Sequence, residues 1–499
     1  MRKEKLCELK EEISSIEKMN GALEIIYWDM QTKMPRKAIE QRSEIIEHLS
    51  GEIFNRTTSD KMGEILDYFV GNIEGLSEID KAIIKNARKE YDYTKKLPEE
   101  RYRKFVVEQS LSQGAWEDAK EKNDFTIFKP HLKKMIDFQR EFAEYIGYED
   151  NKYDALLNKF EEGLTVKKLD IIFKELKDGI LEILNKIEKS GKVINKDFLI
   201  GKFNKESQDK FARFVLKKIG YNFEAGRLDE STHPFTTGFG NKDVRITTNY
   251  SVPDFTSSIF SCIHEAGHGI FEQDIPDELQ KTGLDTAISM SIHESQSRFY
   301  ENIIGRSKEF WEYFLQYAKY EFKEFNNITL EQFYEGINYV KPSLIRTEAD
   351  ELTYSLHIII RYEIEKALIN GDLDIDNVKD EWNKKYKEYL GVEPKNDSEG
   401  ILQDIHWSDG SFGYFPSYAL GNIYGAQILT VMKNEYKDMY SDIRKGEFSH
   451  IQTWLCENIH KYGAIYTPLQ LIKSISNEDL NSKYFLDYLE DKYLTIYKK

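Results

Sequence analysis

Residues 165–188 read TVKKLDIIFKELKDGILEILNKIE, and their apolar side chains recur at steps of three and four. The recurring positions are Leu169, Ile172, Phe173, Leu176, Ile180, Ile183, Leu184 and Ile187. Such steps place these residues on one stripe of a helix with 3.6 residues per turn, and lysine and glutamate fall on the opposite face. The stretch therefore predicts an amphipathic helix that packs against a core.

The same periodicity recurs along the chain and indicates a mainly helical fold. It is found at about 5–20, 100–120, 129–146, 307–325 and 351–370. A prior of roughly 150 residues per domain suggests about three domains for a chain of this length. However, the 499 residues include only ten prolines and no Ser/Gly-rich or Pro-rich linker. We therefore predict one continuous domain over residues 1–499.

Composition and charge exclude several classes of protein. Apolar residues make up 40% and aromatic residues 13% of the chain, which is enough for a large buried core. The net charge of −17 opposes non-specific nucleic-acid binding, which needs a basic surface. The cysteines Cys7, Cys262 and Cys456 are scattered and are typical of reduced thiols. Without an apolar signal core or membrane span, we expect a cytoplasmic protein that does not contact membranes.

One segment departs from the helical pattern. Residues 231–251 read STHPFTTGFGNKDVRITTNYS, with many threonines and β-branched residues and a Gly-Asn turn between two runs. This pattern predicts a short β-hairpin directly before the segment that carries the chemistry. A small sheet beside a helical active site would offer extended peptide backbone an edge to pair with.

The main chemical motif is the pentapeptide His264-Glu265-Ala266-Gly267-His268. Residues four apart on a helix project from one face, so the two imidazoles can share one metal ion. Glu265 can then act as the base that activates water. Gly267 weakens the helix, and we expect it to allow close backbone packing beside the site. The alternative is a pair of histidines that serve only the core or the surface.

A catalytic zinc site needs a third protein ligand, and Glu294 is the candidate. No histidine follows His268 closely, but His293-Glu294 lies about 25 residues downstream in a helical segment, 288–304. Two histidines and a glutamate from a second helix form a gluzincin-type arrangement. In such a site Glu265 takes a proton from the attacking water and delivers it to the leaving amine. The alternative for Glu294 is an ordinary solvated helix carboxylate.

Beyond these residues, the chain resembles the carboxypeptidase Taq family of zinc metallopeptidases over nearly its whole length. The motifs that carry the resemblance are Tyr27-Trp28-Asp29 with Thr32, Met34 and Pro35; His233-Pro234-Phe235; Asp243, Arg245 and Thr247; the HEAGH pentapeptide and His293-Glu294-Ser295-Gln296; Ile345, Arg346, Ala349 and Asp350; and Gly400, Gln403, Asp404, His406 and Trp407. All stand in the family's order, with Tyr27 in place of the usual aliphatic residue.

The resemblance implies a predominantly helical fold with a long, deep substrate groove, similar to neurolysin and angiotensin-converting enzyme. Two helical lobes flanking this groove would be one form of the single domain. The resemblance also implies a homodimer that acts on peptide substrates and binds Zn²⁺ or Co²⁺. The implied reaction removes single C-terminal residues with broad side-chain tolerance.

A carboxypeptidase must hold a terminal carboxylate, which a guanidinium can bind with two parallel hydrogen bonds. Arg346 is the first candidate because it lies in a matching motif, and Arg245 is the second. His233, in its own matching motif, is a further candidate for substrate binding. Outside such motifs, either arginine would more often be a surface ion-pair partner.

The oxyanion that forms during amide hydrolysis needs a hydrogen-bond donor besides the metal. His406, Tyr418 and Tyr424 are the candidates. The two tyrosines lie six residues apart, so one helix would not present both on the same face. Each can instead be a core residue with a satisfied hydroxyl. Asp350 or Asp404 could orient a ligating imidazole from behind.

Two other functions compete with the metallocarboxypeptidase. An oligoendopeptidase would share the metal site without needing the terminal carboxylate. A helical scaffold that binds peptides without cleaving them would be expected to lack Glu265 or a metal ligand, and the sequence retains them all.

Overall fold

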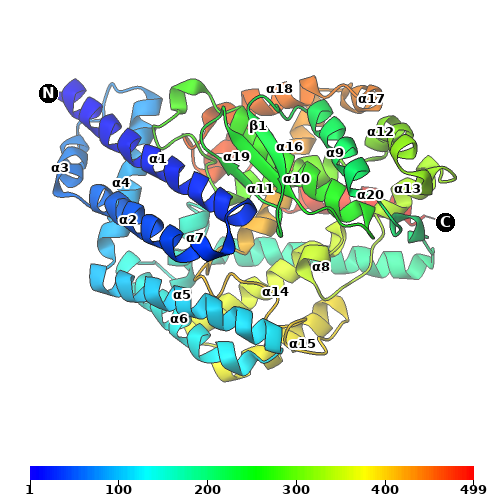
Figure 1. Cartoon of the computed structure of the whole chain (residues 1–499), viewed down its shortest axis with the longest axis horizontal. Coiled ribbons are helices and arrows are strands. Elements are labelled where there is room, and N and C mark those ends of the chain that lie inside the picture. The colour runs from blue at the N-terminus through cyan, green and yellow to red at the C-terminus, as the bar shows by residue number, and fades with distance from the viewer. Residues whose placement is uncertain (499) are drawn as a thin grey trace.

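The computed structural model describes residues 1–498 and shows a large helical body with one small sheet (Figure 1). The prediction of a mainly helical fold is therefore confirmed. Within the described residues, no helix is long and apolar enough to cross a membrane.

The first half of the chain begins with nine α-helices. They are α1 (Arg2–Thr32), α2 (Ile39–Thr57), α3 (Asp60–Phe69), α4 (Glu78–Lys96), α5 (Glu99–Lys122), α6 (Phe125–Ile146), α7 (Lys152–Phe160), α8 (Val166–Ser190) and α9 (Lys205–Ile219). The sheet follows and consists of β1 (Gly226–Glu230), β2 (Thr236–Gly238) and β3 (Val244–Thr248).

The second half is again helical. Its longer elements are α10 (Phe255–Gln273), α11 (Met290–Arg298), the π-helix η4 (Phe299–Ile304), α12 (Lys308–Glu321), α13 (Leu330–Ile337), α14 (Glu351–Asn370), α15 (Val378–Leu390), α16 (Pro416–Glu435), α17 (Met439–Lys445), α18 (Ser449–Asn458), α19 (Pro468–Ser476) and α20 (Lys483–Ile496). The short 3₁₀ helices are η1 (Arg36–Ala38), η2 (Asp197–Leu199), η3 (Asp277–Leu279), η5 (Lys323–Phe325), η6 (Arg346–Glu348), η7 (Ile375–Asn377) and η8 (His460–Tyr462).

Helix α8 forms where the stripe of apolar residues predicts it. Leu169, Phe173, Leu176 and Ile180 are fully or almost fully buried, and the helix packs against α14 and α20. It ends at Gly191, whose φ of 60° is the left-handed conformation that suits a residue without a side chain. Each such buried side chain contributes about 1.5–3 kcal/mol of hydrophobic free energy.

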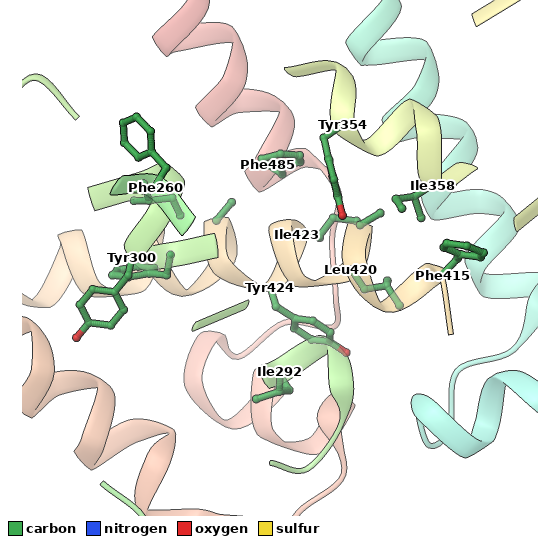
Figure 2. Packing of buried hydrophobic residues seen from close by; sticks show 14 of the residues in the cluster. Phe260, Ile292, Tyr300, Tyr354, Ile358, Phe415, Leu420, Ile423, Tyr424 and Phe485 are labelled. Atoms are coloured by element: carbon green, nitrogen blue, oxygen red, sulfur yellow. The ribbon is translucent and has the colours of Figure 1, made fainter. Parts of the chain in front are cut away.

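Helix α16 runs through the middle of the core and packs against α11, α14 and α20. Leu420, Ile423 and Tyr424 project from it among buried side chains of neighbouring helices, including Ile292 and Tyr354 (Figure 2). This packing holds α11 and α14 at fixed positions. Both helices carry polar residues of the candidate site.

The sheet has the strand order β1-β3-β2. Strands β2 and β3 are antiparallel and form the predicted hairpin, while β1 pairs with β3 in parallel. The polar sequence of β1, GRLDE, lacks alternation between apolar and polar residues, so its periodicity did not predict a strand. Strands β2 and β3 pack against α10, and β2 is an edge strand beside the candidate site.

Candidate metal centre

The HEAGH residues lie within helix α10. Asp254 caps this helix, because its side chain accepts a hydrogen bond from the backbone N–H of Thr256. The rings of His264 and His268 lie on one face, with centroids 5.0 Å apart. At Gly267, the Cβ of any other residue would lie 2.7 Å from the carbonyl oxygen of Gln296 on α11. The absence of a side chain therefore allows α10 and α11 to approach closely.

Glu294 on α11 meets the two histidines. Its Oε2 lies 3.8 Å from Nε2 of His264 and 3.6 Å from Nε2 of His268, and one potential ligand atom from each residue falls within 4.8 Å of the others. Zinc bonds of about 2.0–2.2 Å would separate tetrahedral ligands by roughly 3.4 Å. The spacing and the donor set, two imidazoles and one carboxylate, therefore fit a divalent metal.

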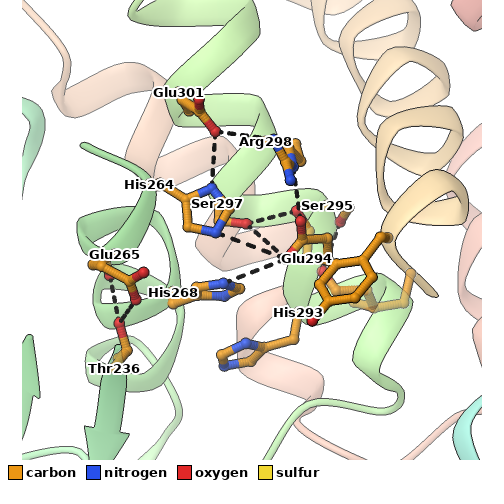
Figure 3. A network of polar contacts seen from close by, with 12 residues as sticks. Thr236, His264, Glu265, His268, His293, Glu294, Ser295, Ser297, Arg298 and Glu301 are labelled. Carbon is orange, nitrogen blue, oxygen red and sulfur yellow. Dashed lines mark hydrogen bonds and ion pairs between the residues drawn. The ribbon is translucent and has the colours of Figure 1, made fainter. Parts of the chain in front are cut away.

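Two charged residues behind the ligands complete a polar network (Figure 3). Arg298 donates to Glu294 Oε1 at 2.7 Å and to Glu301 at 3.3 Å, and Glu301 lies 2.9 Å from Nδ1 of His264. Although burial favours the protonated form of Glu294, Arg298 and His264 hold its pKa well below the usual range. The carboxylate of Glu294 is therefore ionised and can bind a cation.

Sequence reasoning missed Arg298 and Glu301, although a signal for both was present. Arg298 follows Glu294 by four residues, and Glu301 follows Arg298 by three, as expected for residues on one helical face. The π-helix η4, which contains Glu301, is a local change of helical pitch that sequence periodicity does not reveal.

His268 is oriented differently from His264. Among residues 1–498, its Nδ1 has no hydrogen-bond partner. Instead, the ring of His293 stacks on it with centroids 4.3 Å apart and planes 16° apart. Glu272 in turn holds His293, because its carboxylate lies 2.9 Å from Nε2 of that residue. Burial, followed by the charge of His293, lowers the pKa of His268 to about 3, so its imidazole is neutral.

Glu265 lies beside the two histidines and contacts the edge strand. The hydroxyl of Thr236 on β2 donates to its carboxylate at 2.6 Å. Burial raises the pKa of Glu265 above the usual value, against the effect of His264 and of this hydrogen bond. A buried carboxylate with a raised pKa is suited to accept a proton.

Arg346 and Asp404 form a buried ion pair next to these residues. Two guanidinium nitrogens of Arg346 donate to Asp404 Oδ1 at 2.9 and 2.8 Å, and a third donates to the hydroxyl of Tyr354 at 3.1 Å. The ring of Tyr354 lies 4.2 Å from the guanidinium carbon of Arg298. Tyr354 therefore contacts both Arg346, which pairs with Asp404, and Arg298, which pairs with Glu294.

His406 and Tyr418 lie in the same cluster. Nε2 of His406 is 3.1 Å from the hydroxyl of Tyr418, whose ring lies 4.9 Å from the guanidinium carbon of Arg346. Burial is the main cause that lowers the pKa of His406 to about 4. Burial is the main cause that raises the pKa of Tyr418, and the charge of Glu294 is among the smaller causes.

Three other residues singled out in the sequence have different surroundings. Tyr424 is fully buried and donates to Glu161 at 2.6 Å, which matches the alternative of a core residue with a satisfied hydroxyl. Arg245 pairs with Asp243 at 2.7 Å, and its guanidinium lies over the ring of Trp28. His233 is exposed in the loop before β2.

The carboxylates suggested to orient an imidazole have other partners. Asp350 caps α14 by accepting from the backbone N–H of Thr353. Asp404 pairs with Arg346 and Arg361. Glu301, and neither Asp350 nor Asp404, is therefore the carboxylate that contacts Nδ1 of His264.

Comparisons with known proteins identify the family. The chain matches the carboxypeptidase Taq (M32) metallopeptidase family over residues 8–493. Carboxypeptidase 1 of Bacillus subtilis (strain 168) is 45% identical over 486 residues, which cover 97% of each chain. Thermostable carboxypeptidase 1 of Pyrococcus furiosus is 38% identical over 475 residues, 95% of each chain.

Solved structures agree with these sequence matches. The crystal structure of an M32 carboxypeptidase from Deinococcus radiodurans R1 superposes with a TM-score of 0.96 at 32% identity, covering 99% of this chain and 100% of that one. The family match and the matched relatives span almost the whole chain. The chain therefore belongs to the carboxypeptidase Taq (M32) metallopeptidase family and is a metal-dependent carboxypeptidase.

Proposed function

We propose that His264, His268 and Glu294 hold one Zn²⁺ ion, with Co²⁺ as the alternative, and that the enzyme removes single residues from peptide C-termini with broad side-chain tolerance. The observation that carries this proposal is the convergence of three potential ligand atoms within 4.8 Å. When bound, the ion lowers the pKa of a water molecule and polarises the scissile carbonyl.

Glu265 is the general base and acid of the proposed reaction. Its carboxylate lies beside the imidazoles and takes the proton of the attacking water, which it then delivers to the leaving amine. The hydrogen bond from Thr236 fixes the orientation of this carboxylate. Because Thr236 belongs to the edge strand β2, substrate backbone paired with this edge would lie next to Glu265.

Arg346 binds the terminal carboxylate of the substrate in this proposal. Asp404 and Tyr354 hold its guanidinium in place, so little side-chain entropy is lost when the substrate binds. His406 is neutral near pH 7, since its pKa is about 4. The Tyr418 hydroxyl and the His406 imidazole are the candidate donors to the developing oxyanion. Arg245 and His233 are secondary candidates for contacts farther along the substrate.

The organisation and location of the protein are proposed on separate grounds. One cluster of buried apolar residues extends from Leu9 to Tyr497, which supports a single domain over residues 1–499. The three cysteines are free, which supports a reducing, cytoplasmic location. A homodimer is proposed from the family resemblance, and light scattering coupled to size-exclusion chromatography would measure it.

Two measurements test the proposed reaction. Elemental analysis of the purified protein should find one zinc or cobalt ion per chain. The metal-loaded enzyme should release the last residue of a test peptide and leave its C-terminally amidated twin intact, as judged by mass spectrometry. Equal cleavage of the twins would favour an oligoendopeptidase, and absence of cleavage with retained peptide binding would favour a non-catalytic peptide-binding protein.

A further inference from the structure

The π-helix η4 continues α11 and carries Glu301 to the back of the candidate metal centre. The Oε2 atom of Glu301 lies 2.9 Å from Nδ1 of His264 and 3.3 Å from a guanidinium nitrogen of Arg298 (Figure 3). In the π-turn, the backbone N–H of Gly305 donates to the carbonyl of Tyr300, five residues back, at 2.8 Å. Turns of this kind are rare and often occur at functional sites, and here the turn sets where the Glu301 side chain lies.

The carbonyl of Asn302, next to Glu301, is held by two side chains of α20. The Nζ of Lys492 and the hydroxyl of Tyr488 each donate to it at 3.3 Å. Within residues 1–498, no backbone N–H beyond the end of η4 donates to this carbonyl. Carbonyls at the end of a helix favour a cation, which the ammonium group of Lys492 supplies. Lys492 and Tyr488 therefore bind the turn at the carbonyl that adjoins Glu301.

Lys492 is itself fixed by a buried ion pair. Its Nζ lies 2.6 Å from Oε2 of Glu351 at the start of α14, and the hydroxyl of Tyr493 donates to the same oxygen at 2.9 Å. The side chains of Lys492 and Glu351 are only 7% and 2% exposed. A buried pair of this kind often stabilises a fold no more than two apolar residues would, so stability alone does not explain it. Unlike an apolar side chain, however, the ammonium group can donate to the carbonyl of Asn302.

Arg306 holds the same turn at two further points. Its Nε donates to Oδ1 of Asn302 at 3.1 Å, and its Nη2 lies 3.5 Å from Oε1 of Glu301. The guanidinium carbon of Arg306 lies 3.8 Å from the ring centre of Phe260 on α10, the helix that carries His264. The main chain and the side chain of Asn302 are therefore both held, and Glu301 has little freedom to turn away from His264.

We propose that Lys492 and Tyr488 are positioning residues of the metal centre. By holding the carbonyl of Asn302, they fix the π-turn that aims Glu301 at His264. The inference rests on the proposed metal site and extends it to α20, which contributes no proposed ligand. Loss of these hydrogen bonds should let the turn relax and draw Glu301 away from His264. We expect the metal to bind about 3- to 10-fold more weakly, a part of the 10- to 100-fold effect of losing an orienting partner.

The test measures metal affinity by competition with a chromogenic chelator. The variant E351Q/K492M removes the ammonium group together with the charge of its partner, so that no buried carboxylate is left unpaired. The variant Y488F removes only the second donor and should have a smaller effect on affinity. The matched control is Y493F, which loses a hydrogen bond to Glu351 from the same helix but leaves both donors to Asn302 in place. Its metal affinity should match that of the wild type.

Double-mutant cycles with E301Q separate positioning from a general loosening of the fold. If Lys492 acts through Glu301, E351Q/K492M should weaken metal binding in the wild-type background but change it less than about twofold in the E301Q background. A merely structural role would lower the affinity equally in both backgrounds. Circular dichroism and urea denaturation of the metal-free proteins would measure folding separately. If E351Q/K492M does not fold, the same cycle with Y488F decides.

Wild-type affinity in both E351Q/K492M and Y488F would overturn the inference. Equal losses with and without E301Q, or unchanged affinity in E301Q itself, would overturn it too. Each of these results would leave the proposed metal site intact, because the wild-type protein would still bind one ion. If the wild-type protein bound neither zinc nor cobalt, the proposed metal site would fail and this inference with it.

Discussion

The carboxylate of Glu301 lies 2.9 Å from Nδ1 of His264, while Nε2 of the same ring faces Glu294. In the neutral form that binds a metal ion, this contact places the remaining ring proton on Nδ1 and leaves the lone pair of Nε2 for the ion. His268 lacks a comparable partner in the described part of the chain and is held by the stacked ring of His293. The two histidines are therefore oriented by different means.

Replacing Glu301 with glutamine should weaken metal binding about 10- to 100-fold, because an amide is a poorer acceptor for the Nδ1 proton of His264. Competition with a chromogenic chelator would measure the dissociation constant. Glu309→Gln is a suitable control, because the Glu309 carboxylate pairs with Arg444 on the surface. The metal affinity of this variant should match that of the wild type. Equal affinities of the two variants would contradict an orienting role for Glu301.

Glu265→Gln should lower kcat at least about 100-fold and leave metal content unchanged, because the amide keeps the shape of the side chain but accepts no proton. Peptide release and elemental analysis would be measured on the same preparation. Glu24→Gln is the control, because Glu24 accepts a hydrogen bond from Thr237 on the same edge strand and has no proposed catalytic role. Activity of Glu265→Gln near that of the control would rule out Glu265 as the base.

Local sequence patterns account for most of the fold and of the candidate site that the sequence predicts. Steps of three and four predict α8, and the spacing of His264 and His268 predicts their common face, because both depend only on helical geometry. The pairing of Arg346 with Asp404 joins segments 58 residues apart and depends on the packing of the whole core. The strand β1 has no apolar pattern of its own and is held by β3.

The oxyanion candidates show the same limit. Residues six apart on one helix face different directions, so at most one of Tyr418 and Tyr424 could face the site. Periodicity could not decide which, because the orientation of α16 is set by its contacts with α11, α14 and α20. The structure turns Tyr424 towards the buried Glu161 and Tyr418 towards His406.

Gly267→Ala should destabilise the protein by about 1–3 kcal/mol and weaken metal binding. The new methyl group would lie 2.7 Å from the Cα of Ser297, so α10 and α11 would have to separate and draw the histidines away from Glu294. Urea denaturation and chelator competition would measure the two effects.

Gly114→Ala provides the matched comparison. Gly114 lies inside α5, and a Cβ added there would meet no atom within 4 Å. The higher helix propensity of alanine should therefore raise the free energy of unfolding by about 0.5–1 kcal/mol without changing metal affinity. Destabilisation of similar size in both variants would exclude helix–helix contact as the reason for Gly267.

Glu365 on α14 accepts three hydrogen bonds in the core. Trp407 and the backbone of Gly413 donate from the loop that carries His406, at 2.8 and 3.1 Å, and Tyr153 donates from α7 at 2.6 Å. Glu365→Gln should place an amide N–H against one of these donors, because an amide has a single acceptor oxygen. We expect a loss of about 1–3 kcal/mol in the free energy of unfolding at pH 5.

The loss of unfolding free energy caused by Glu365→Gln should shrink as the pH rises. Burial is the main cause that raises the pKa of Glu365 from 4.5 to about 7. Between these values the folded chain keeps a proton that the unfolded chain releases, so the contribution of Glu365 to stability falls with increasing pH, by roughly 3 kcal/mol in total. Glutamine does not titrate, so the unfolding free energy of the Glu365→Gln variant should lack this decrease with pH. Urea denaturation at intervals from pH 5 to 8 would measure both proteins, and parallel curves would show that Glu365 does not titrate in this range.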